Sequence, residues 1–99
     1  MNRTVDQNQQ QIIDALRSIG CTVQDLSQLG RGCPNVLIGY RGRNFLLEIK
    51  SGDRVPKLTP REEQWIRQWD GQVGVITSIE DALAIVREAD YEDATDRSK

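Results

Sequence analysis

The chain has 99 residues, a formal net charge of −2, 28% charged residues and 37% hydrophobic residues. This length supports one domain with one modest core and is too short for two. The net negative charge excludes a polycation that coats nucleic acid without specificity, and the absence of histidine excludes Ser-His-Asp and Cys-His catalysis. No apolar run approaches the length of about 20 residues that a membrane-spanning helix needs. The composition therefore predicts a soluble, cytoplasmic protein without membrane association.

The two cysteines, Cys21 and Cys33, cannot complete a zinc site, because the chain has no histidine to join them. No secretory signal points to an oxidising compartment. Reduced, half-buried thiols are the expected state, and a disulfide between the two is the alternative.

The first elements follow from hydrophobic spacing. Ile12, Leu16 and Ile19 recur at helical intervals, so one face of a helix beginning near Thr4 is expected in the core, and Gly20 ends this helix. Residues 21–26 are expected to form a strand, and residues 27–32 a loop.

Two further strands, at residues 35–40 and 44–50, are predicted to form a hairpin around Arg41-Gly42-Arg43. Residues two apart on a strand point to the same face. Glu48 and Lys50 should therefore project together, with Leu47 and Ile49 on the opposite face.

A second helix is predicted from the capping box Thr59-Pro60-Arg61-Glu62. Trp65 and Trp69 share one face of it and are expected in the core, the alternatives being a base-stacking platform and the anchor of an oligomer interface. A buried strand at residues 73–77 and a helix after Ser78 follow. The order αβββαβα indicates an α/β domain over residues 1–88, followed by an acidic tail, residues 89–99, that is expected to be disordered.

Basic side chains concentrate in the middle of the chain, around the hairpin and the loop that follows it. Such local clustering is typical of nucleic-acid binding. The predicted DNA-binding residues are Arg31, Arg41, Arg43, Arg54, Lys57 and Arg61.

Pro34-Asn35 at the start of one strand and Glu48-x-Lys50 at the end of the next resemble the core of the PD-(D/E)XK nucleases. The likeness is strongest to the small stand-alone VRR-NUC type of phages and prophages, and it covers roughly residues 4–86. It implies a restriction-endonuclease-like fold, with a small mixed sheet flanked by helices. It also implies a structure-specific DNA endonuclease, similar to Holliday-junction resolvases, that acts on branched DNA as a homodimer in the cytoplasm of a bacterial host.

The resemblance implies specific residue roles. Glu48, Lys50, Asn35 and Gln64 would be catalytic, and Asn35, Glu48 and Ile49 would lie at a Mg²⁺ or Mn²⁺ ion. Mg²⁺ prefers oxygen ligands and keeps several waters, so one or two carboxylates and a substrate phosphate suffice to hold it. Such an ion activates water and neutralises charge on the phosphate, and the lysine can orient the nucleophile.

The family pattern has aspartate where this chain has Asn35. The family's first helix also carries an acid, for which Gln11 is the best match, and Asp25 is the nearest carboxylate that could compensate. The sequence thus leaves three hypotheses: a nuclease weakened or inactivated by Asn35, an inert DNA-binding module on the nuclease fold, and an interaction protein that keeps only the scaffold.

Overall fold

A computed structural model of the chain describes the backbone of residues 3–51 and 56–97 and the side chains of residues 7–51 and 56–91. The elements in chain order are α1 (Arg3–Ser18), β1 (Thr22–Asp25), β2 (Val36–Tyr40), β3 (Arg43–Ile49), α2 (Pro60–Gln68), β4 (Gly74–Ile76) and α3 (Ile79–Arg97). This order confirms the predicted αβββαβα arrangement. None of the helices in the described residues is long and apolar enough to cross a membrane.

The four strands form one mixed sheet in the order β1-β2-β3-β4. β1 and β2 are antiparallel, as are β2 and β3, whereas β3 and β4 are parallel. The β2–β3 hairpin turns at Arg41 and Gly42, whose φ angles of 53° and 79° match the left-handed geometry of a two-residue hairpin turn. The predicted three-residue turn is thus one residue shorter, because Arg43 already pairs with Tyr40.

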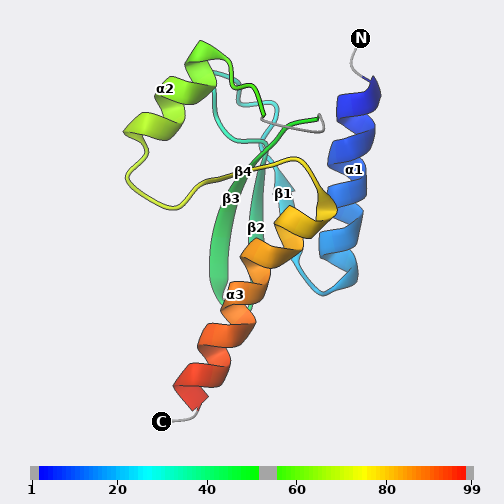
Figure 1. The fold of residues 1–99 in the computed structure, drawn as a ribbon, viewed down its shortest axis with the longest axis vertical. Helices are drawn as coiled ribbons and strands as arrows, with labels where there is room; N and C mark the ends of the chain where they lie inside the picture. The colour runs from blue at the N-terminus through cyan, green and yellow to red at the C-terminus, as the bar shows by residue number, and fades with distance from the viewer. Residues whose placement is uncertain (1–2, 52–55, 98–99) are drawn as a thin grey trace.

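The core lies between one face of the sheet and the pair α1 and α3, which pack against each other (Figure 1). Ile12 and Leu16 of α1 and Val86 of α3 are completely buried, as is Leu47 of β3. The 3.6-residue period of the helices and the two-residue period of the strands place these side chains in one cluster.

α3 continues as a helix to Arg97, whereas the sequence led us to expect a disordered tail from residue 89. Ala89 extends the apolar stripe formed by Ala82 and Val86 and is fully buried. Asp90 then accepts a hydrogen bond from the Tyr40 hydroxyl at 3.1 Å, which ties this turn of the helix to the sheet.

α2 begins at the predicted capping box: Thr59 Oγ1 accepts the Glu62 N–H at 3.2 Å, and Glu62 Oε1 accepts the Thr59 N–H at 2.8 Å. None of its residues is buried, and it stands apart from α1 and α3 (Figure 1). The expectation that its tryptophans belong to the core is wrong. The rings of Trp65 and Trp69 stack on each other instead, with centroids 4.6 Å apart.

Candidate active site at the carboxyl end of β3

The side chains of Glu48 in β3 and of Lys50, the residue directly after β3, lie on the face opposite to the core. Leu47 and Ile49 are buried among the core residues, so strand alternation directs Glu48 and Lys50 the other way. Lys50 Nζ lies 3.9 Å from Glu48 Oε2, which agrees with the expected shared face. Glu48 is only 2% exposed and is the one charged residue buried in the described part of the chain.

Asn35 lies directly before β2 and links it to the end of β3. Its Oδ1 accepts the Ile49 N–H at 2.5 Å, and its main-chain oxygen accepts the Leu26 N–H at 2.7 Å. The side chain therefore fixes the backbone next to Glu48. An amide oxygen has a second lone pair, so this bond does not use up its capacity as an acceptor.

A second carboxylate, Glu62 of α2, completes the group. Its Oε1 lies 2.5 Å from Lys50 Nζ, so the lysine is held between Glu48 and Glu62. The sequence identified Glu62 only as the capping-box residue. Its second role was not predicted, because the periodic patterns of the strand and the helix do not show how close the start of α2 comes to the end of β3.

Burial raises the pKa of Glu48 to about 8, and the negative charge of Glu62 and a hydrogen bond with it act in the same direction, while Lys50 opposes them. Burial acts to raise the pKa of Glu62 as well, but hydrogen bonds from Lys50 and the Thr59 backbone, the lysine charge and the bond with Glu48 lower it overall. The raised pKa favours the protonated form of the Glu48 carboxyl at neutral pH when no cation is bound, with the Glu62 carboxylate as its hydrogen-bond partner. A shift of this size is typical of functional sites.

Cys33 lies beside this group, which its sequence position did not indicate. Burial and the negative charge of Glu48 raise the pKa of the Cys33 thiol. Both cysteines are free, so the disulfide alternative does not hold in this structure.

Neither Gln11, the match to the family's helix acid, nor Asp25, the carboxylate that could compensate, has a hydrogen bond or ion pair with the group within the described residues. Gln11 is exposed, and the Asp25 side chain accepts hydrogen bonds from the Ser27 N–H and hydroxyl at 2.8 and 2.6 Å. The α1 residue that meets the end of β3 is Asn8, one turn before Gln11. Its Nδ2 donates to the main-chain oxygens of Lys50 and Thr77 at 3.1 and 3.3 Å.

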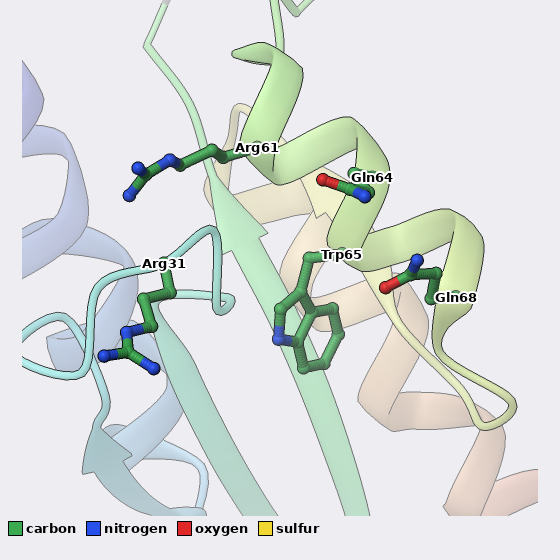
Figure 2. Close-up of a pocket in the computed structure, with 5 residues that line it drawn as sticks. All are labelled: Arg31, Arg61, Gln64, Trp65 and Gln68. Atoms are coloured by element: carbon green, nitrogen blue, oxygen red, sulfur yellow. The ribbon is translucent and has the colours of Figure 1, made fainter.

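The basic residues separate into two regions. Arg31 and Arg61 line a hollow together with Gln64, Trp65 and Gln68 (Figure 2). Arg61 directly precedes Glu62 in α2, so the hollow borders the helix that contributes Glu62 to the active-site group. Lys57 is exposed in the loop before α2, and Arg54 lies outside the described residues.

Arg41 and Arg43 lie at the hairpin turn, at the opposite end of β3 from Glu48. The Arg41 Nε lies 2.6 Å from Asp90 Oδ1. This ion pair gives Arg41 a structural partner on α3.

The donor set fits a hard divalent cation with few protein ligands. Glu48 Oε1 is buried and has no hydrogen-bond partner within the described residues, which is the state of an atom that lacks its natural partner. The same part of the chain contains no group of three His, Cys, Asp or Glu side chains that could hold a metal. Glu48 and Glu62 would need the Asn35 amide or main-chain oxygens beside them, a combination that Mg²⁺ accepts.

Comparison with solved structures finds a protein described as "VRR_NUC domain", which superimposes with a TM-score of 0.59. It is 25% identical to this chain, and the match covers 84% of this chain and 94% of the other. No family model matches the sequence, and no curated protein matches it.

Proposed function

Because the chain has the VRR-NUC family fold, we propose that it is a metal-dependent DNA endonuclease whose site lies at the carboxyl end of β3. The observation that supports this most is the buried carboxyl of Glu48, which has an unpartnered oxygen and lies next to Lys50 and Glu62. A structural ion pair would satisfy both oxygens of its acid. A site built to receive a cation leaves one oxygen open.

In this proposal Glu48, Glu62 and Asn35, with the main-chain oxygen of Ile49, hold a Mg²⁺ or Mn²⁺ ion. When bound, the ion supplies positive charge to the phosphate and makes water a better nucleophile. Lys50 positions the nucleophile or offsets charge on the phosphate. Asn35 also holds the Ile49 backbone in place through its 2.5 Å hydrogen bond.

The proposed substrate is branched DNA, cut by a homodimer in the manner of a Holliday-junction resolvase. A domain of 99 residues covers little duplex by itself, and a two-fold dimer presents two sites to a two-fold junction. A phage origin and action in the bacterial cytoplasm complete the proposal and rest on the resemblance to the stand-alone VRR-NUC type.

The second candidate function is a catalytically inert module that binds DNA on the same fold. Asn35 favours it, because a neutral amide replaces the carboxylate of the family pattern and contributes no charge to cation binding. Glu62 weighs against it, because it returns a second carboxylate to the site.

A cleavage assay on a labelled four-way junction, with Mg²⁺, Mn²⁺ or EDTA, tests the proposal. We expect cutting with Mn²⁺ that disappears in EDTA and in the near-isosteric variant Glu48→Gln. Junction binding without cutting in any metal supports the inert module. Cutting that survives in Glu48→Gln contradicts the assigned site.

A further inference from the structure

The hollow beside the active-site group has a volume of about 420 Å³. It lies between the loop that carries Arg31 and the helix α2, and the Trp65 ring extends from α2 toward this loop (Figure 2). Among the residues that the structure describes, its lining consists of Arg31, Arg61, Gln64, Trp65 and Gln68 and includes no carboxylate. The size falls within the usual range for pockets that take a small molecule.

Trp65 is presented as a platform rather than as a core residue. It is half-buried, and its ring stacks on Trp69 with an interplanar angle of 19°. Trp69, which is 46% exposed, therefore holds the Trp65 ring in a fixed orientation, and the Trp65 ring stays outside the core. An indole held in this way can stack on any nucleobase.

Arg31 occupies a conformation that costs free energy. Its φ of 57° is left-handed, between Gly30 at 65° and Gly32 at 83°. A side chain other than glycine seldom adopts this geometry, and such strain collects at functional sites. The loop therefore places the Arg31 side chain at the hollow in a conformation that glycine would adopt at a lower cost.

The loop is also pressed against the start of α2. A Cβ atom on Gly32 would collide with the main-chain carbonyl of Arg61, so the two backbones touch at this point. This close approach brings Arg31 and Arg61 to the rim of the same hollow. Neither has an ion pair within the described part of the chain, so both are available to an anion.

Gln64 and Gln68 lie one helical turn apart on the same side of α2 (Figure 2). Their amides can donate to and accept from the edges of a base, as unpaired bases require when they leave a stack. The hollow thus combines an aromatic surface, two cations and two amides. This is the combination that one nucleotide requires.

We propose that this hollow binds one unpaired nucleotide of the DNA substrate, with its base on Trp65 and its phosphate at Arg31 and Arg61. The inference rests on the proposed function and deepens it. Arg61 is followed directly by Glu62, which holds Lys50. The bound nucleotide would therefore lie next to the DNA strand that occupies the active site. Fully paired DNA, including a four-way junction whose arms are all paired, must unpair a base to fill the hollow, whereas a flap offers one freely.

Equilibrium binding in EDTA tests this without cleavage. The probe is a short duplex with an unpaired flap, compared with the same DNA whose flap nucleotides are abasic. For the unaltered protein we expect the base to strengthen binding about 5- to 150-fold, the range of one base stacked on an aromatic ring. Trp65→Leu should reduce this ratio to near one, and Trp65→Phe should keep part of it. Urea unfolding checks that both variants fold.

Arg31→Gln should weaken both DNAs equally and reduce the salt slope by about 0.7, the value for one phosphate contact on a single strand. Arg67→Gln is the matched control, because Arg67 is on α2 outside the hollow and pairs with Glu63. We expect Arg67→Gln to leave the base-to-abasic ratio unchanged.

A ratio of one for the unaltered protein, or the same ratio in Trp65→Leu, overturns the inference. If the unaltered protein shows a base-to-abasic ratio of one but still cuts DNA through Glu48, only the nucleotide pocket is rejected. If the unaltered protein shows the expected base-to-abasic ratio but cuts DNA in no metal, only the proposed nuclease activity is rejected.

Discussion

Asn35 has two physical roles that a single substitution can separate. Its Oδ1 accepts the Ile49 N–H, and its amide stands where the family pattern places a charge. Asn35→Asp keeps the acceptor and adds a negative charge near Glu48. We expect at least a tenfold gain in Mn²⁺ affinity, measured by calorimetry, because charge-assisted contacts are roughly twice as strong as neutral ones. Cleavage should increase with it.

Asn35→Ala is the matched control. It removes the acceptor and leaves the Ile49 N–H unpaired, which should cost about 1–3 kcal/mol of unfolding free energy in urea titrations. If Asn35→Asp binds Mn²⁺ no better than the unaltered chain, residue 35 does not occupy the metal-binding position that the aspartate has in the family pattern.

The raised pKa of Glu48 predicts how stability depends on pH without metal. The pKa of this carboxyl is ordinarily 4.5 and rises to about 8 in the fold, so folding takes up a proton between these values. The stabilising contribution is complete below pH 4.5 and is lost as the pH rises through about 8. The slope cannot exceed about 1.4 kcal/mol per pH unit for one proton. Urea titrations across this range should show falling stability, and Glu48→Gln should flatten the trend.

A divalent cation should reverse part of this trend, because it competes with the proton for Glu48. We expect Mn²⁺ to raise the urea midpoint more near pH 8 than near pH 5. An equal rise at both pH values would place the ion away from Glu48.

Strand alternation was sufficient to predict that Glu48 and Lys50 share a face, because the period of two is independent of the rest of the fold. Glu62 and Cys33 could not be predicted, since both reach the site from loops or helix starts whose direction depends on tertiary contacts. Gln11 is exposed, and the residue of α1 that meets the end of β3 is Asn8, because the packing of α1 sets its rotation, which the sequence pattern does not specify.

The helix α2 depends on its cap and on its ion pair more than on burial, because none of its residues is buried. Thr59→Ala removes the cap and should cost about 1 kcal/mol of stability. Glu62→Gln can keep the reciprocal cap, since glutamine serves at this position, but it loses the charge that faces Lys50. We expect Glu62→Gln to stay close to normal stability and to lose at least tenfold in metal-dependent cleavage.

Urea unfolding and the junction assay on both variants distinguish these effects. If Thr59→Ala and Glu62→Gln lose activity in proportion to stability, Glu62 acts only through the cap, and the second carboxylate has no part in the site.

At the level of elements, the periodic patterns predicted every helix and strand in order. The errors concern where the last helix ends and what the tryptophans of α2 pack against. The acidic composition of the last segment suggested disorder, but Ala89 continues the buried stripe and Asp90 has a partner on β2. The tryptophans of α2 were assigned to the core on their spacing alone. Spacing identifies a shared face but not what that face meets.

The whole molecule covers one face of its sheet with α1 and α3 and leaves part of the other face open. Leu37 and Leu46 lie on that second face and line a shallow hollow with Trp69. We predict that this surface contributes to a homodimer, because apolar and aromatic groups are enriched in interface cores. Sedimentation at micromolar concentration, with and without junction DNA, should show a dimer that Trp69→Gln weakens. A monomer under both conditions contradicts the prediction.

The hydrogen bonds of Asn8 also have a kinetic meaning. They join residues 42 and 69 positions apart in the chain, whereas the β2–β3 hairpin closes through neighbouring residues. The chain must lose the entropy of closing a long loop before contacts between distant residues can stabilise it. The hairpin can therefore form early, while the site at its end is completed only when α1 docks across both β3 and β4. The centre therefore cannot be complete until the chain from Asn8 to Thr77 has left the ribosome, so a shorter nascent chain has no assembled site to act on nucleic acid.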